Sequence, residues 1–419
     1  MEGSGSAPTE SAFDEAFGSI YRREWGPAVA AIMPDARDLA LAEDCVQEAF
    51  GRAFRAWSRD GLPDRPGAWI RVVAKRLLID HVRSAEAGSR AISRLWAEPL
   101  WRVELETIDE SEEVSRDDEL ALLLLCCHPA IAPTDQVLLM LRTVAGLTPQ
   151  QIAPLFYGRE SGVRSRLTRA KRKIRTSRIP LRRPDEVDLQ SRLGLVLIAV
   201  RLAFTHGRRP GALSLEAGTE LRQEAIRLAR LAVGLTPERG EAWSLLALLL
   251  LTEVRTATAT NGEGLWVPLA NQDRSQWGRE RIDEARQALE VGRRLDPQSS
   301  LQLEAEISAH HTFAATAADV DWAAIRDLYF ELLKTQGENA GVQLNAAVAV
   351  AETGNTATAL DLLDKLDPAE AGHPWRVHSA KAHVHQLAGD ADAARRQWSI
   401  AAATAPPMLK EQLQLRADQ

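Results

Sequence analysis

The strongest concentration of cationic side chains in this sequence lies between residues 159 and 183. The segment holds eleven Arg or Lys residues against one acidic residue, Glu160, which gives a local charge of +10. Cationic side chains at this density neutralise phosphate groups and release the counterions bound to nucleic acid. The segment therefore predicts duplex binding, and the alternative is a basic helix face that is only solvated.

A helix–turn–helix pattern leads into this basic segment. Gly146 suits the left-handed residue that closes a helix, and Thr148 with Gln151 forms a capping box around Pro149 at the start of the next helix. Apolar residues spaced three and four apart predict a further helix over 163–175. In such a module the start of the second helix contacts base edges, and basic residues farther along contact phosphates.

Different residues of this basic helix are expected to contact base edges and phosphates. The residues predicted to face bases are Gly162, Arg164, Ser165 and Arg169. The phosphate backbone is the predicted partner of Lys171, Arg172 and Lys173, and the same segment adds two further DNA-binding candidates, Arg159 and Arg166.

Two amphipathic helices are predicted nearer the N-terminus. In residues 41–57 an apolar stripe lies opposite a polar face that carries Glu43, Asp44, Gln47, Glu48, Arg52 and Arg55. The turn 61–67 opens a second helix, 68–84, which mixes apolar residues with the basic residues Arg71, Lys75, Arg76 and Arg83. Taken alone, each polar face is equally well explained as solvated surface.

Residue types that often carry catalysis or bind metals do not form a recognisable site in this sequence. Zinc needs four ligands, and Cys126-Cys127-His128 has no second ligand pair nearby, so buried packing is the better interpretation. The sequence contains no glycine-rich phosphate loop, nucleophile elbow or paired carboxylates. It therefore predicts no enzyme activity, no metal site and no cofactor.

Composition and charge place the chain among globular proteins. Its 419 residues are 45% hydrophobic and 26% charged, with a net charge of −7, which fits two or three domains. The apolar runs are far shorter than the ~18 residues of a membrane span, and the N-terminus lacks the pattern of a secretory signal. Three cysteines suit a reducing compartment, so we expect a cytoplasmic protein with no membrane contact.

Helical periodicity runs through nearly the whole sequence, so the predicted fold class is all-α. Residues 98–119 hold ten acidic residues against two arginines and are predicted to form an exposed linker. Beyond residue 184, four helices end alike, before Pro237, Pro297, Pro368 and Pro406. This recurrence is typical of tetratricopeptide-like stacking, although the spacing of 60, 71 and 38 residues between these prolines is irregular.

Three groups of residues resemble one known family. Residues 38–50 (DLALAEDCVQEAF), followed by 65–70 (RPGAWI) and 74–83, resemble region 2 of extracytoplasmic-function sigma factors. Residues 163–171 (VRSRLTRAK) resemble the recognition helix of their region 4. A subgroup with a tetratricopeptide-like C-terminal extension is similar in the segments 126–130, 224–230 and 271–277.

The resemblance implies a dissociable subunit of bacterial RNA polymerase that confers promoter recognition. The implied partners are promoter DNA and core RNA polymerase, through its β′ clamp helices and β flap. In the family, a polar face of region 2 docks on the clamp helices, and the residues of this sequence that match it are Asp44, Gln47, Glu48 and Arg52. The part that recognises and melts the minus-10 element is matched by Trp69, Arg71, Lys75, Arg76 and Arg83, although Trp69 equally suits the core.

Three residues depart from the family pattern in the helix–turn–helix. Pro154 stands within the first helix, where it predicts a kink or an early end. Arg159 replaces the usual capping Ser or Thr and Gly162 replaces a common Thr, so the recognition helix is predicted to begin late or to fray. We therefore expect an unusual or weakly bound upstream promoter element.

The predicted division of the chain has five parts. These are a disordered N-terminus (1–17), sigma region 2 (18–88), an acidic linker (89–116), sigma region 4 (117–180) and a tetratricopeptide-like helical domain (185–419). The last part is expected to regulate the sigma modules in cis and to bind a protein or ligand partner. Two alternatives stay open: an interaction scaffold with a degenerate sigma module, and a DNA-binding regulator that acts without polymerase.

Overall fold

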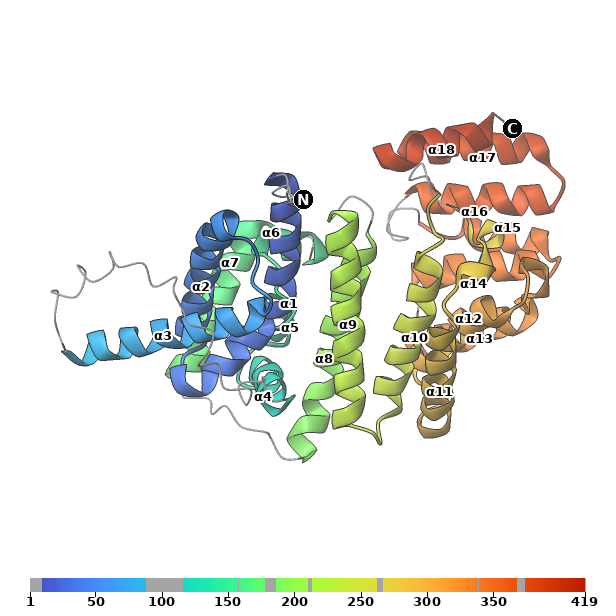
Figure 1. Cartoon of the computed structure of the whole chain (residues 1–419). Helices are drawn as coiled ribbons and strands as arrows, with labels where there is room; N and C mark the ends of the chain where they lie inside the picture. The colour runs from blue at the N-terminus through green and yellow to red at the C-terminus, as the bar shows by residue number, and fades with distance from the viewer. Residues whose placement is uncertain are drawn as a thin grey trace. The chain divides into compact units, whose positions relative to one another are not determined.

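A computed structural model of the chain describes residues 10–87, 116–156, 158–177, 186–209, 213–261, 267–337, 339–367 and 374–418. Every regular element in these ranges is a helix, which confirms the predicted all-α fold class (Figure 1). Among the helices described, none combines the length and the apolar character that crossing a bilayer requires. The chain forms two compact units, Met1–Ala232 and Val233–Gln419.

The first unit groups both predicted sigma modules with the first residues of the predicted extension. Its elements are α1 (Glu10–Ala36), α2 (Leu39–Asp60), α3 (Pro66–Ala87), α4 (Arg116–Cys126), α5 (Pro133–Thr143), α6 (Pro149–Ile152), the 3-10 turn η4 (Ala153–Phe156), α7 (Glu160–Thr176), α8 (Glu186–Arg208) and α9 (Leu215–Leu235). The predicted linker 89–116 lies outside the described residues except for its last one. The predicted domain ranges stay a prediction.

Aromatic side chains form the core of the first three helices. Trp25 of α1 is fully buried and stacks with Phe50 of α2, with ring centroids 6.2 Å apart. Five of the six residues predicted for the apolar stripe of α2 are at most 4% exposed: Val46, Ala49, Phe50, Ala53 and Trp57. The prediction is wrong for the sixth, Phe54, which is 43% exposed. Burial of the other five fixes the rotation of α2 and determines which of its polar residues face outward.

The N-terminal helix begins earlier than the sequence predicts. Residues 10–17 are helical, so the expectation of disorder through residue 17 is wrong for this part. Phe13 and Phe17 contact Phe54 of α2 at centroid distances of 5.5 and 5.1 Å, and these contacts tie the first turns of α1 to α2. Residues 1–9 lie outside the described residues.

The predicted helix–turn–helix signals are confirmed up to Pro154. Gly146 is left-handed, with φ +68°, and the capping box forms because the Thr148 hydroxyl accepts from Gln151 N–H while the Gln151 side chain accepts from Thr148 N–H. The α-helical turn α6 ends at Ile152, and the chain continues as a 3-10 turn through Pro154. Proline therefore ends the first helix early, as its missing N–H predicts.

The recognition helix α7 does not begin late. Arg159 is extended and makes no side-chain cap, yet the helix starts at the next residue, Glu160. Glu160 lies in the first turn, where its charge favours the helix N-terminus, and it accepts from Arg164 four residues on. These interactions stabilise the first turn without a side-chain cap, so the predicted late start is wrong.

Helices α8 and α9 cross closely at two glycines. Gly207 and Gly218 are both buried, and a Cβ added at Gly218 would lie 2.6 Å from the Gly207 carbonyl oxygen. Arg222 Nη1 of α9 donates to the same carbonyl at 2.9 Å. The absence of side chains at the crossing therefore sets the separation of the two helices.

The second unit is a succession of packed helix pairs, as the tetratricopeptide-like pattern predicts. Its α-helices are α10 (Gly240–Thr256), α11 (Arg279–Leu295), α12 (Ser300–Phe313), α13 (Trp322–Gln336), α14 (Ala340–Glu352), α15 (Thr356–Asp364), α16 (Pro374–Leu387), α17 (Ala391–Thr404) and α18 (Pro407–Ala417). Each pair buries small and branched side chains against the next, for example Ala347, Leu363 and Val377.

The motif 271–277 has a structural role in this unit. Arg274 Nη1 donates to the carbonyl oxygens of His311 and Ala314 at 2.6 and 3.0 Å, at the C-terminal end of α12. Trp277 Nε1 donates to Thr258 Oγ1 at 2.9 Å, just beyond α10. The motif therefore joins the C-terminal end of α12, through backbone carbonyls, to the segment after α10, through a side-chain hydroxyl.

Candidate nucleic-acid interface

Helix α7 presents its basic residues because a narrow apolar stripe holds its opposite side in the core. Val163, Leu167, Ala170 and Ile174 are 3–5% exposed. The predicted contact residues that lie exposed on the same helix or at its start are Arg159, Gly162, Arg164, Ser165, Arg169, Arg172 and Lys173. The structure thus gathers most of the predicted DNA-binding residues of this segment on one surface.

Three of the predicted DNA-binding residues on α7 have acidic partners. Arg164 Nε donates to Glu160 Oε1 at 2.8 Å on the solvent side. Arg166 Nε donates to Asp135 Oδ1 of α5 at 2.6 Å. Lys171 Nζ pairs with Glu43 of α2, which lies in the other predicted sigma module. All three cationic side chains are therefore paired with carboxylates of the chain itself.

The predicted polymerase-docking residues lie together on α2. Asp44, Gln47 and Glu48 are exposed, and Arg52 Nε donates to Glu48 Oε1 at 3.0 Å. Although the Asp44 side chain reaches solvent, desolvation by the surrounding protein raises the pKa of its carboxyl; Lys171 opposes this shift, and the nearby carboxylate Glu43 adds to it. The face therefore carries negative charge next to the contact with α7.

The residues of helix α3 that are predicted to act at the minus-10 element differ in their exposure to solvent. Trp69 is 6% exposed and packs on Trp57 with ring centroids 5.2 Å apart, which favours the core role that the sequence left open. Arg71 Nη1 pairs with Glu24 of α1 at 3.4 Å. The basic residues that are exposed on α3 are Lys75, Arg76 and Arg83.

The two predicted sigma modules meet at Glu43, whose side chain is 5% exposed. Its Oε1 accepts from the Thr143 hydroxyl at 2.7 Å, and its other oxygen pairs with Lys171. A second pair joins Arg175 Nη1 to Asp38 Oδ2 at 3.6 Å. The sequence analysis placed Glu43 on a polar face but missed this contact, because its partners are 100 and 128 residues away.

Helix α1 adds a backbone-level contact between the same modules. The Arg142 guanidinium lies 4.5 Å from the centroid of the Trp25 ring. A Cβ added at Gly26 would lie 2.6 Å from the Val144 carbonyl oxygen, so α1 and the end of α5 approach more closely than side chains permit. Close approach of this kind requires glycine.

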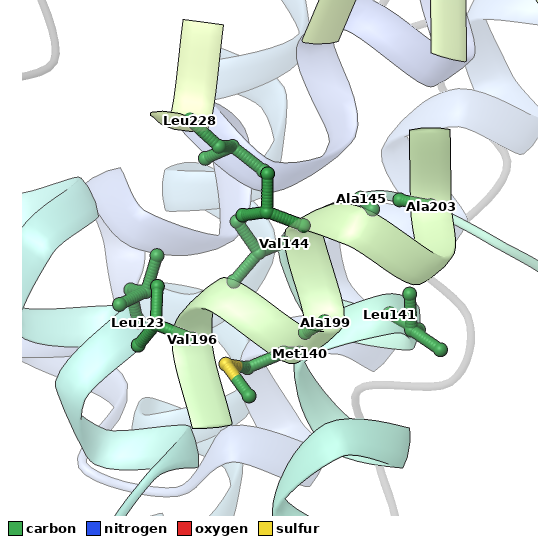
Figure 2. Close-up of a pocket in the computed structure, with 10 residues that line it drawn as sticks. Leu123, Met140, Leu141, Val144, Ala145, Val196, Ala199, Ala203 and Leu228 are labelled. Atoms are coloured by element: carbon green, nitrogen blue, oxygen red, sulfur yellow. The ribbon is translucent and has the colours of Figure 1, made fainter. Parts of the chain in front are cut away.

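The helix pair α8–α9 packs on the predicted region 4 module through an apolar seam. Figure 2 shows the pocket along it, where Leu123, Met140 and Val144 face Val196 and Ala199 of α8. Every side chain that lines this pocket is apolar, so it contains no group that would orient a polar ligand. We interpret it as a packing gap.

Polar contacts reinforce the attachment of α8 and α9. Arg192 Nη1 of α8 donates to the Leu124 carbonyl at 2.9 Å, and Arg227 Nη1 of α9 pairs with Glu119 of α4 at 2.7 Å. Glu220 of α9 pairs with Arg22 of α1. Helix α9 therefore contacts both predicted sigma modules.

The cysteines are part of the core, as predicted for Cys126 and Cys127, which are 0% and 1% exposed. Burial raises the pKa of the Cys127 thiol to about 12 and that of Cys45 to about 11, so both thiols are protonated near neutral pH. Among the described residues, no group of three or more His, Cys, Asp or Glu side chains is placed to hold a metal ion.

Comparisons with known proteins match both parts of the chain. The family model for sigma-70 region 2 matches residues 28–87, and a family of unknown function (DUF6596) matches residues 192–292. The probable ECF RNA polymerase sigma factor SigI of Mycobacterium tuberculosis is 37% identical over 142 residues, which are 34% of this chain and 48% of that protein. The chain belongs to the extracytoplasmic-function sigma factors.

Two further relatives extend the similarity of this sigma factor beyond region 2. The probable RNA polymerase sigma factor RfaY of Xanthomonas campestris pv. campestris is 28% identical over 211 residues, 48% of this chain and 49% of that protein. Uncharacterized protein R00370 of Rhizobium meliloti (strain 1021) is 34% identical over 379 residues, which cover 90% of this chain and 89% of that protein. The sigma factor thus shares its large C-terminal extension with R00370.

Proposed function

We propose that this sigma factor binds core RNA polymerase through α2 and directs promoter-specific transcription initiation. The observation that carries the proposal is the exposed polar face of Asp44, Gln47, Glu48 and the adjoining Arg52, which lies inside the segment matched by sigma-70 region 2. The buried stripe on the other side of α2 is occupied by the core of its own module. The polar face is therefore available to a partner with complementary charge.

The proposed DNA contacts come from α3 and α7. On α3, the exposed Lys75, Arg76 and Arg83, with Arg71 beside them, would contact phosphates around the minus-10 element, while Trp69 belongs to the core. On α7, the start of the helix would face bases of the minus-35 element through Gly162, Arg164, Ser165 and Arg169. The phosphate contacts would come from Arg159, Arg166, Lys171, Arg172 and Lys173.

We further propose that the extension regulates the sigma modules in cis. Support comes from α9, which pairs with α1 through Glu220 and Arg22 and with α4 through Arg227 and Glu119. A helix that contacts both modules biases their relative arrangement, and a partner bound to the extension would shift that bias. A transcription assay distinguishes activation by the extension from inhibition.

The polymerase contact is tested by reversing charge on α2. Asp44→Arg combined with Glu48→Arg should weaken binding to core polymerase at least ~10-fold, because both residues are exposed and their partner surface must be basic. Helical content should not change, since neither side chain is part of the core. Glu331→Arg combined with Asp392→Arg, at exposed sites on α13 and α17, is the charge-matched control. Wild-type affinity of the double variant would contradict the docking assignment.

The cis contact is tested by a charge swap. Glu220→Arg should change promoter-dependent transcription by removing the pair with Arg22, and Arg22→Glu in the same chain should restore the wild-type level. Restoration distinguishes this contact from a general loss of stability. Equal transcription by the wild type and both variants would exclude a role for it.

A further inference from the structure

A buried histidine lies where the extension packs on the predicted region 4 module. His206, near the C-terminal end of α8, is 2% exposed. Neither of its ring nitrogens has a hydrogen-bond partner among the residues that the structure describes. The DNA and polymerase contacts proposed for this sigma factor do not use this side chain. Polar groups that are buried without a partner are rare in proteins, so the imidazole needs an explanation.

The periodicity of α8 explains why the imidazole has no partner. Residues three and four apart lie on one face of a helix, so His206 continues the buried stripe of Val196, Ala199 and Ala203. This stripe lines the apolar seam that Figure 2 shows. An imidazolium in the seam would need an acceptor or water to offset the burial of its charge, and the apolar lining supplies neither. The seam therefore accepts only the uncharged ring.

The charged groups around His206 are cationic. Arg209, directly after α8, donates its backbone N–H to the His206 carbonyl oxygen at 3.0 Å. Burial, followed by the charge of Arg209, lowers the pKa of the imidazole. On α9, Arg222 Nη1 donates to the carbonyl oxygen of Gly207, the next residue along α8, at 2.9 Å. The α5 residues that line the seam, Met140 and Leu141 among them, are apolar.

We propose that His206 is an acid-sensitive latch, in which protonation of the imidazole displaces the end of α8 from the apolar seam and loosens the attachment of the extension. This inference rests on the proposed regulation in cis and gives it a chemical signal, the proton. The closed form holds the uncharged ring in the seam. The open form exposes the ring to water, where an imidazole has its ordinary pKa of about 6.5.

The size of the effect follows from the difference in proton binding between the two forms. A proton binds the open form and not the closed form, so acid raises the ratio of open to closed molecules. With a pKa of about 6.5 in the open form, this ratio rises ~10-fold between about pH 7.5 and about pH 5.5.

Movement at the end of α8 reaches both sigma modules through α9. Gly207, directly after His206, is in close contact with Gly218 of α9. Helix α9 pairs with α1 through Glu220 and with α4 through Arg227. An end of α8 that leaves the seam withdraws support from α9 at the glycine crossing. Acid should therefore weaken the contacts of α9 with both modules.

The test measures local opening of α8 and α9 in the full chain, without polymerase or DNA. Hydrogen exchange followed by mass spectrometry gives the opening constant of each peptide, once the observed rate is divided by the intrinsic rate at the same pH. In the wild type, the opening constants of peptides from α8 and α9 should rise up to ~10-fold from about pH 7.5 to about pH 5.5.

The variant His206→Leu places a side chain that binds no proton in the same apolar seam, so the rise attributed to the latch should disappear. His81→Leu, which replaces an exposed histidine of α3, is the matched control and should keep the full rise. A rise of equal size in the wild type and in His206→Leu would overturn the latch.

A second measurement keeps the proposal testable if His206→Leu does not fold. The ring nitrogen signals of 15N-labelled histidines report the protonation of each imidazole by NMR, and the conservative variant His206→Gln assigns the signal of His206. In the closed wild type this ring should stay uncharged at about pH 5.5, where an imidazole in water is mostly protonated. A His206 ring that titrates near pH ~6.5 in the closed form would overturn the latch. Since neither measurement uses polymerase or a promoter, failure of the latch and failure of the proposed sigma function are distinguishable.

Discussion

Replacing Gly218 by Ala should push α9 away from α8 and loosen the contact of the extension with both sigma modules. The new Cβ would lie 2.6 Å from the Gly207 carbonyl oxygen and 3.6 Å from its carbon. That carbonyl is held in place because it ends a helix and accepts from Arg222 at 2.9 Å. Relief therefore requires movement of a whole helix, and Glu220, two residues along α9, moves with it.

The size of the effect is the difference between two opposing contributions. Overpacking of a close contact costs about 1–3 kcal/mol. Alanine in place of glycine inside a helix favours folding by about 0.5–1 kcal/mol. The net change for Gly218→Ala is a destabilisation of up to about 2.5 kcal/mol. At Gly194, inside α8, an added Cβ meets nothing within 4 Å, so Gly194→Ala should stabilise by about 0.5–1 kcal/mol.

Hydrogen exchange measured by mass spectrometry on peptides covering 186–235 gives the free energy of opening for this helix pair. Protection should fall in Gly218→Ala and rise in Gly194→Ala. The same increase in protection for both variants would refute the close crossing of α8 and α9. It would mean that an added Cβ is tolerated as well at Gly218 as at Gly194.

Two further predictions concern charge. Burial, together with Arg255 and Arg274, lowers the pKa of His311 from 6.5 to about 4. Between these pH values the folded state therefore binds fewer protons than the unfolded state. The free energy of unfolding should fall by up to about 3 kcal/mol as the pH drops from about 6.5 to 4. Thermal unfolding against pH checks this, and His311→Gln should flatten the profile. Arg172→Ala with Lys173→Ala should reduce the salt slope of duplex binding by about 1.8, at ~0.9 per phosphate contact. An unchanged slope would assign both residues to solvated surface.

Local signals in the sequence predicted local structure well. The capping box of Thr148 and Gln151 and the early helix end at Pro154 depend on residues within one helical turn, and the structure confirms both. The late start predicted for α7 is wrong because a cap is one of several ways to stabilise a first turn. Glu160 and its pair with Arg164 provide another.

Nonlocal contacts were not predictable from one sequence. Lys171 looked like any member of a basic run, and Glu43 like any acid on a polar helix face. Their pairing depends on how α2 and α7 pack, which no spacing pattern encodes. Trp69 illustrates the same limit: an aromatic residue on a basic helix suits base stacking and core packing equally, and its contact with Trp57 favours the core.

The central claim is that this sigma factor directs core RNA polymerase to specific promoters. In vitro transcription of genomic DNA from the source organism by its core polymerase, with start sites read by sequencing, tests the claim directly. We predict start sites that share an upstream motif, that require the wild-type chain, and that are lost with Asp44→Arg combined with Glu48→Arg. The same set of start sites with and without the folded chain would contradict the account.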